Sequence, residues 1–173
     1  MSLSIRDAAL ADREAILGLN REGRPGVTAL APAEVDACIA RATLFRVAEF
    51  GSEIAGYLIA FDTGFSAIGD EYAWFSARYT SFLYVDQIAV ASRFRSSGVG
   101  SALYNDLAAQ AARRDIQRVV CEVNLRPPNP GSLAFHTSLG FAEAGQMEVS
   151  DGRLVSLLER STAPLARRTH SFK

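Results

Sequence analysis

The chain has 173 residues, of which 49% are hydrophobic and 21% are charged. This composition supplies enough apolar material for one domain with a hydrophobic core, and it excludes a disordered chain. The formal net charge of −1 excludes a protein that holds nucleic acid through an overall positive field. Any anionic ligand must therefore be bound by a local site.

The cysteines and the distribution of apolar residues bear on metal binding and on the expected location of the protein. The two cysteines, Cys38 and Cys121, form no CxxC pair and no Cys/His cluster. We therefore interpret them as buried thiols and predict no metal site. Residues 1–7 are polar and charged, and no window approaches the roughly 20 apolar residues of a membrane span. We expect a cytoplasmic protein with no membrane partner.

The first half of the chain carries both helix and strand signals. Asp12 is a candidate N-cap, Pro32 fits the first turn of a helix, and apolar residues follow each at helical spacing. Residues typical of strands flank Gly51 and Ser52, which indicates a hairpin. The elements predicted here are a strand at 3–6, a helix at 12–21, a helix that begins after Ala31, and strands at 43–50 and 54–61. Residues 62–81 follow as a long segment, which we interpret as a functional loop.

The second half contains the strongest helix pattern. Asn129 can cap a further, short helix, and Gly140 fits its exit. The predicted elements are a strand at 82–90, a helix at 98–114, a strand at 117–123, a helix at 129–139, and a hairpin of 147–149 and 154–158 that turns at Asp151 and Gly152. We predict one domain over residues 1–160 and a polar tail over residues 161–173.

The order of these elements predicts the fold class. A strand–helix–strand unit around residues 98–114 implies a right-handed parallel crossover, whereas the hairpins imply antiparallel pairing. Together they predict an α+β fold, with a central mixed, mostly antiparallel sheet of six to seven strands and four helices.

The stretch between Asp86 and Leu103 indicates a phosphate site. A strand ends near Val90, a basic turn follows, and Gly98 and Gly100 open a helix. Free N–H groups and the positive end of the helix dipole favour an anion there, and glycines let a phosphate approach the backbone. The alternative is a helix that simply begins with glycines.

Two other phosphate-binding motifs do not fit this stretch. A dinucleotide-binding fingerprint needs a third glycine where Leu103 stands, and it has no basic turn before its glycines. A P-loop needs a Gly-Lys-Ser/Thr run, which the sequence lacks. A dinucleotide-dependent oxidoreductase is therefore disfavoured. A nucleic-acid module is also disfavoured, because the sequence has neither a basic stripe nor an aromatic stacking motif.

Residues 88–103, which read IAVASRFRSSGVGSAL, resemble the pyrophosphate motif of the GNAT superfamily of N-acetyltransferases, Gln/Arg-x-x-Gly-x-Gly/Ala. The three defining positions are matched by Arg95, Gly98 and Gly100. The chain departs from the motif at Ser92, Phe94 and Ser97, where proline, tyrosine and a second basic residue are frequent. None of these changes removes a backbone donor, although the loss at Ser97 is expected to weaken phosphate affinity.

Residues 129–141, which read NPGSLAFHTSLGF, resemble a second motif of the same family, Asn-x-x-Ala/Ser-x-x-Phe-Tyr-x-x-Leu-Gly-Phe. Asn129, Ser132 and His136 share one helix face, which in this family meets the pantetheine arm and the sulfur. His136 stands where the family often has a tyrosine that protonates the departing thiolate, and histidine can also donate a proton. The alternative is a surface histidine with no catalytic task. Tyr104 is a weaker substitute for the acid.

The resemblance implies a function and a cofactor site. It implies direct transfer of an acetyl group from acetyl-CoA to a primary amine of a small molecule or a peptide, at a sheet that splays open between strands 82–90 and 117–123. The backbone along the first of these strands is expected to bind the pantetheine. The residues implied to bind the cofactor are Gln87, Ile88, Ala89, Val90, Arg95, Ser96, Ser97, Gly98, Val99, Gly100, Ser101, Asn129, Ser132 and His136.

Asp86 and Glu122 are the candidates for the base that deprotonates the attacking ammonium. Asp86 lies on the strand that is expected to hold the thioester, where members of the family frequently carry a carboxylate. The alternative for Asp86 is an ion pair with an arginine such as Arg78. Glu122 lies within an apolar strand, so its carboxylate needs a partner or a purpose.

Aromatic residues in or beside the 62–81 segment are candidates for lining the acceptor pocket. Asp70 and Glu71 would attract a cationic amine. The alternative is an aromatic cluster that only stabilises a long loop. The five candidates are Tyr72, Trp74, Phe75, Tyr79 and Tyr84.

A second functional hypothesis stays open because of the histidine at position 136. It is a catalytically weak acyl-CoA-binding module that senses acetyl-CoA or regulates a partner. Many relatives form dimers, so a homodimer is also left open, and the sequence does not identify the acceptor amine.

Overall fold

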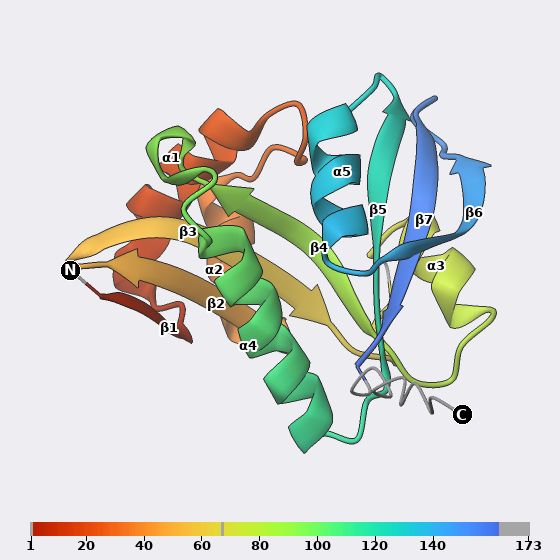
Figure 1. Ribbon diagram of the computed structural model, residues 1–173, viewed down its shortest axis with the longest axis horizontal. Helices are drawn as coiled ribbons and strands as arrows, with labels where there is room; N and C mark the ends of the chain where they lie inside the picture. Colours follow the sequence, from red (N-terminus) through yellow and green to blue (C-terminus); the bar gives the residue numbers. More distant parts are fainter. Residues whose placement is uncertain (1, 67, 163–173) are drawn as a thin grey trace, which may run out of the picture.

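A computed structural model describes residues 2–66 and 68–162. Within them, seven strands form one sheet in the order β1-β2-β3-β4-β5-β7-β6 (Figure 1). Neighbouring strands are antiparallel except β4 and β5, which run parallel. The strands are β1 (Leu3–Asp7), β2 (Leu44–Phe50), β3 (Glu53–Phe61), β4 (Leu83–Val90), β5 (Arg118–Arg126), β6 (Ala142–Glu148) and β7 (Leu154–Ser161).

Helices cover both faces of the sheet. Figure 1 shows α4 and α5 in front of it, where Leu103 and Leu107 belong to one apolar core. The second core lies on the other face and contains Ile16, Val35 and Phe75. The helices are α1 (Arg13–Gly23), α2 (Pro32–Arg41), α3 (Asp70–Ser76), α4 (Val99–Arg113) and α5 (Pro130–Ser138), with 3₁₀ turns at Leu10–Asp12 and Ser92–Phe94. None of the helices in the described part of the chain has the length and apolarity that crossing a membrane requires.

The observed architecture confirms the predicted α+β fold with a mostly antiparallel sheet, but it contains five α-helices where four were predicted. The additional helix, α3, lies within the 62–81 segment, which we predicted as a loop. Seven residues are too few to show helical periodicity, and so short a helix depends on tertiary contacts. Tyr72 and Phe75 supply those contacts, because both are buried in the core.

The C-terminal strands are longer than predicted. β6 spans Ala142–Glu148 rather than residues 147–149, because its half-exposed, glycine-containing sequence hides the strand pattern. β7 runs to Ser161, one residue into the predicted polar tail. The rest of that tail, from residue 163, lies outside the described residues.

The parallel pair in the sheet is short. Leu83 pairs with Val119 and Tyr84 pairs with Val120, and no further residues of β4 and β5 pair within the described part of the chain. Beyond this seam the two strands separate towards their C-terminal ends, as the resemblance implied. The edge of β4 that faces β5 therefore has no strand partner from residue 85 to residue 90.

A β-bulge lies next to the seam. Val85 pairs with Ala60 and Gln87 pairs with Ile59, which leaves Asp86 as an extra residue on β4. A bulge bends its strand and increases the local twist. The bulge at Asp86 thus explains why β4 turns away from β5 directly after the seam.

A buried polar network ties the loop between α1 and α2 to the sheet. The Asn20 side chain donates to Thr28 O at 2.9 Å and to Gln87 Oε1 at 3.1 Å, and its oxygen accepts from Leu30 N at 3.0 Å. Tyr57 Oη donates to Gln87 Oε1 at 2.8 Å. Asn20 and Gln87 are 2% and 4% exposed, so these hydrogen bonds are shielded from water and fix the loop.

We expect replacement of Asn20 with alanine to lower the free energy of unfolding by about 1–3 kcal/mol, because buried partners lose their hydrogen bonds. Chemical denaturation of the purified variant measures this change. Asn105→Ala is the matched control, since Asn105 is exposed. Equal midpoints for the two variants would contradict a stabilising role for the network.

Candidate active site

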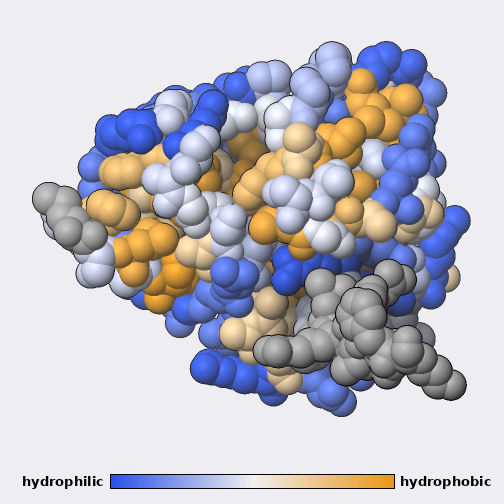
Figure 2. Space-filling view, in the orientation of Figure 1, coloured by the Kyte–Doolittle hydropathy of each residue, from blue (hydrophilic) through white to orange (hydrophobic). Residues whose placement is uncertain are grey.

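A cleft of about 850 Å³ lies where β4 and β5 separate. Its walls come from the end of β4, the start of α4, the loop after β5, helix α5 and the loop between α1 and α2. Because β4 and β5 are parallel, the helices that follow them both begin at this edge of the sheet (Figure 1). The space-filling view shows a hollow with apolar residues in its walls on this face (Figure 2).

The start of α4 presents backbone donors to the cleft. The first N–H groups of a helix have no acceptor within it, and here they belong to Val99, Gly100 and Ser101, which all line the cleft. Gly98 adopts φ 86°, a left-handed conformation that favours glycine, and so lets the chain turn sharply into the helix. Arg95 is exposed beside it. This arrangement suits a phosphate or diphosphate.

Gly100 also has a packing role. A Cβ atom at this position would lie 2.8 Å from Cζ of Phe135, which belongs to α5. The glycine therefore allows the two helices that flank the cleft to approach each other. Gly100 thus leaves the backbone at the start of α4 open to a ligand and also lets α4 and α5 pack closely.

The structure brings together most residues that we predicted to bind the cofactor. All of them line the cleft except Gln87 and Ser97. The Gln87 side chain belongs to the buried network with Asn20, and Ser97 Oγ donates to Phe94 O at 2.5 Å. The cleft residues among the predicted set are Ile88, Ala89, Val90, Arg95, Ser96, Gly98, Val99, Gly100, Ser101, Asn129, Ser132 and His136.

Sequence reasoning missed one wall of the cleft. This wall is the end of α1 and the loop that follows, residues 22–27, and Pro127 and Pro128 extend the opposite side. The signal in the sequence was Gly23, Pro25 and Gly26, which we interpreted only as the end of a helix. Such turn residues indicate a loop but do not tell which side of the sheet it covers.

His136 lies in the cleft wall with both ring nitrogens engaged. Nε2 is 2.7 Å from Tyr104 Oη, and Nδ1 is 2.8 Å from Ser132 O. The residue is 3% exposed, so the surface-histidine alternative does not describe it. Burial lowers the pKa of His136, while the hydrogen bond to Ser132 opposes this shift. Whether His136 protonates the thiolate stays a prediction.

Asp86 and Glu122 lie on neighbouring strands beyond the seam. Burial, followed by the charge of Glu71, raises the pKa of Asp86 from 3.8 to about 6. Burial raises the pKa of Glu122 well above its usual range, and the charges of Glu71 and Asp86 add to this effect. Burial thus raises the pKa of both carboxyls, and the pKa of about 6 leaves Asp86 largely ionised at neutral pH.

The surroundings of these two acids contain little compensating charge. Within the described residues, Asp86 has no ion-pair partner, and Arg78 instead stacks on Trp74 at 3.6 Å. Oε2 of Glu122 is buried without a hydrogen-bond partner there. Glu71 pairs with Arg153 at 3.0 Å. Asp86 therefore leaves negative charge available near the seam.

The five aromatic candidates form a cluster between α3 and the sheet. Phe75, Tyr84 and Tyr72 are 0%, 2% and 4% exposed, and the ring of Tyr84 contacts the other two. Tyr79 stacks on Phe75, and Trp74 contacts the same ring edge to face. The cluster stabilises α3 as the structural alternative proposed, and a role in lining an acceptor pocket stays a prediction.

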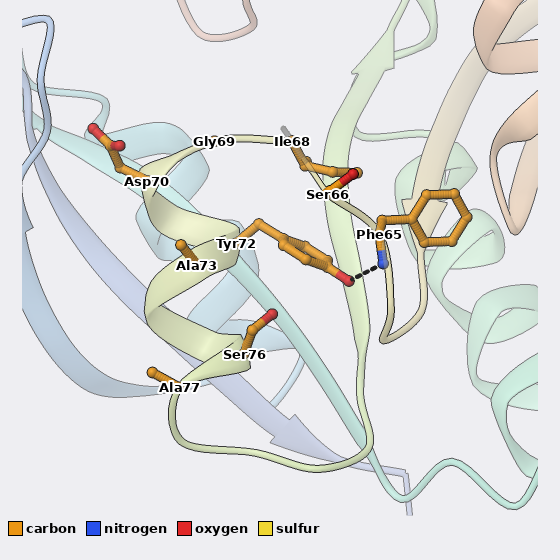
Figure 3. Close-up of a pocket in the computed structure, with 9 residues that line it drawn as sticks. All are labelled: Phe65, Ser66, Ile68, Gly69, Asp70, Tyr72, Ala73, Ser76 and Ala77. Atoms are coloured by element: carbon orange, nitrogen blue, oxygen red, sulfur yellow. Dashed lines mark hydrogen bonds between the residues drawn. The ribbon is translucent and has the colours of Figure 1, made fainter.

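A second cavity, of about 670 Å³, lies between α3 and the loop before it. Of the five aromatic candidates, Tyr72 lines it (Figure 3). Its hydroxyl accepts from Phe65 N at 3.1 Å and donates to Asp62 O at 2.6 Å, which fixes the loop on the helix. No group of three or more His, Cys, Asp or Glu side chains in residues 2–66 and 68–162 could hold a metal ion.

Comparisons with known proteins agree with this arrangement. Residues 15–141 match the Acetyltransferase (GNAT) family. No curated protein matches the chain. Ard1 from Thermoplasma volcanium has a TM-score of 0.76 at 17% identity, with 95% of this chain and 100% of that chain covered.

The descriptions of two further solved structures name different acceptors. The ribosomal-protein-S18-alanine N-acetyltransferase from Escherichia coli has a TM-score of 0.71 at 16% identity, with 96% of this chain and 98% of that chain covered. A phosphinothricin acetyltransferase from Sinorhizobium meliloti, solved in complex with AcCoA, has a TM-score of 0.71 at 21% identity, with 93% and 89% covered. At these identities the likeness shows the fold.

The family match covers more than half of the chain, from residue 15 to residue 141, and it spans both motifs and the separated strands between them. The chain therefore belongs to the GNAT family of acetyltransferases, enzymes that take the acetyl group from acetyl-CoA.

Proposed function

We propose that this protein transfers an acetyl group from acetyl-CoA to a primary amine by direct attack. The observation that carries the proposal is the cleft between β4 and β5, which is walled by the start of α4 on one side and by α5 on the other. The diphosphate of the coenzyme binds the first N–H groups of α4. The pantetheine follows the edge of β4 that no strand pairs.

The acceptor enters from the face that carries Asp86 and Glu122. Asp86 takes a proton from the substrate ammonium, directly or through water, and the free amine attacks the thioester carbonyl carbon. The C–N bond forms and the C–S bond breaks. The nitrogen then loses its second proton, which water passes to the departing coenzyme A thiolate, so that the products are the amide and the free thiol. Asp86 suits the role of base because its pKa of about 6 leaves it ionised at neutral pH.

Charge near the seam favours a cationic acceptor. Asp86 has no ion-pair partner in the described residues, and Glu71 shares its single described ion pair with Arg153. The described acceptors of the two N-acetyltransferases above, a ribosomal protein alanine and phosphinothricin, differ in size. The class of amine therefore follows from this chain's own site rather than from its fold. A cytoplasmic location and a homodimer stay predictions.

A panel of amines tests the proposal. We expect the full chain to release free thiol from acetyl-CoA when a cationic primary amine is present, and to form the corresponding acetamide. Matched acids or neutral amides, which offer no primary amine, should give no release above the background hydrolysis. Thiol release that does not depend on any amine would contradict acyl transfer to nitrogen.

The second hypothesis, an acyl-CoA sensor, gains one observation from the structure. Both nitrogens of His136 are engaged in hydrogen bonds, so no ring proton is free for the thiolate. Tight binding of acetyl-CoA in a calorimetric titration, together with no turnover across the panel, would favour the sensor over the enzyme.

A further inference from the structure

Two buried side chains from different helices meet at the wall of the cleft. Tyr104 of α4 and His136 of α5 are 2% and 3% exposed. The Tyr104 hydroxyl lies 2.7 Å from His136 Nε2. The rings of Phe135 and Phe141 contact the imidazole edge to face at 5.3 and 5.4 Å. The imidazole is thus surrounded by aromatic rings, with Tyr104 beside Nε2 and Ser132 beside Nδ1.

The hydrogen bonds assign the ring protons. Ser132 O can only accept, so Nδ1 of His136, 2.8 Å away, must carry a proton. In the neutral ring Nε2 is then an acceptor, and the Tyr104 hydroxyl donates to it. Ser132 Oγ also lies 3.3 Å from Nδ1. The proton on Nδ1 therefore points into the helix rather than to an open position in the cleft.

Burial favours the neutral forms of both rings. Burial lowers the pKa of His136 and raises the pKa of Tyr104 well above its usual range, with Cys121 of β5 adding to the latter. Glu122 raises the pKa of Tyr104 further, and Arg160 lowers it. Tyr104 therefore keeps its proton and stays a donor.

We propose that Tyr104 is a positioning residue that holds His136 as the neutral Nδ1–H tautomer. His136 then braces α5 against α4 and fixes Ser132 in the cleft, in place of the proton-donor role that the sequence suggested. The inference rests on the proposed acyl transfer for its kinetic consequence, but the protonation state of the ring does not depend on turnover. The ammonium loses two protons in each cycle: Asp86 takes the first before the attack, and the second leaves the nitrogen after the C–N bond forms and reaches the thiolate through water.

Nitrogen-15 NMR of the histidine side chains tests the protonation state directly. The chain has two histidines, and a His170→Ala variant assigns the signals of His136. We expect a protonated Nδ1 and an unprotonated Nε2 at neutral pH, and titration only at a pH below that of an ordinary histidine. In the Tyr104→Phe variant, we expect the chemical shift of Nε2 to move to the value of an unprotonated nitrogen that accepts no hydrogen bond. Titration of His136 near 6.5, its ordinary value, or a proton on Nε2 would overturn the proposal.

Kinetics of His136→Gln supply the second measurement. If His136 only positions Ser132, we expect kcat to fall by less than about tenfold, with the shape of the pH profile unchanged. Loss of a general acid instead predicts a fall of about 10²–10⁴-fold and loss of the alkaline limb, which would also overturn the proposal. If acyl transfer itself is wrong, no amine will support turnover in any variant, while the NMR result still decides the tautomer.

Discussion

Asp86→Asn is expected to lower kcat/KM for the amine by about 10²–10⁴-fold, the usual contribution of a general base. The asparagine keeps the shape of the side chain on the bulge but cannot accept the proton of the ammonium. In the unaltered protein, kcat/KM should rise as the pH increases through about 6, because Asp86 must be ionised to act. In Asp86→Asn this acid limb should disappear. Steady-state rates between about pH 5 and pH 8 measure both effects.

Melting temperatures distinguish a loss of activity caused by a missing base from one caused by a damaged fold. The folded-state pKa of Asp86 is raised above its usual 3.8 to about 6. Ionisation of Asp86 therefore costs stability as the pH rises from about 4 through about 6, and a neutral amide removes that cost. We expect Asp86→Asn to melt at the same or a higher temperature than the unaltered protein at pH 7. Glu122→Gln is the matched variant, and a larger loss of activity there would transfer the role of base to Glu122.

Gly100→Val is expected to lower the affinity for coenzyme A by about a hundredfold, or about 2.7 kcal/mol. The new Cβ would stand 2.8 Å from the Phe135 ring, so either the ring or the start of α4 must move into the cleft. Overpacking of this kind typically costs 1–3 kcal/mol. The displaced helix start would also misplace the N–H groups that hold the diphosphate. Isothermal titration with coenzyme A measures the change.

Gly18→Val supplies the control for Gly100→Val. Gly18 also lies within a helix, but a Cβ there would meet no atom closer than Arg21 Nη2 at 3.9 Å. We expect this variant to bind coenzyme A as the unaltered protein does. Unchanged affinity in Gly100→Val would show that the start of α4 does not hold the coenzyme.

The sequence predicted the parts of the fold that follow local rules. The helix that opens at Gly98, the hairpin at Gly51 and the cap at Asn129 all depend on neighbouring residues. Asn129 Oδ1 accepts from Ser132 N at 3.3 Å, as its position predicted. Helix α3 could not be predicted in this way, because its short length makes it dependent on the core that Tyr72 and Phe75 enter.

Features of the candidate site that depend on contacts between distant residues could not be predicted from the sequence either. Asn20 gave no signal that it joins Gln87 across 67 residues. The resemblance placed a carboxylate at Asp86, but the bulge that isolates it arises from pairing with β3. Likewise, the resemblance placed His136 in the cleft, whereas its tautomer depends on Tyr104, a partner from another helix. Chemistry at the site thus depends on non-local pairs more than on the motifs.

The short seam between β4 and β5 has a consequence for how the molecule holds its shape. Two residue pairs join the halves of the sheet through the backbone, yet each apolar core contains side chains from both halves, such as Tyr84 and Val155. Side-chain volume, rather than a hydrogen-bond ladder, therefore sets the width of the gap. A bound molecule that bridges the gap between β4 and β5 adds to this volume. When its free concentration is a hundred times its Kd, it raises the free energy of unfolding by about 2.7 kcal/mol.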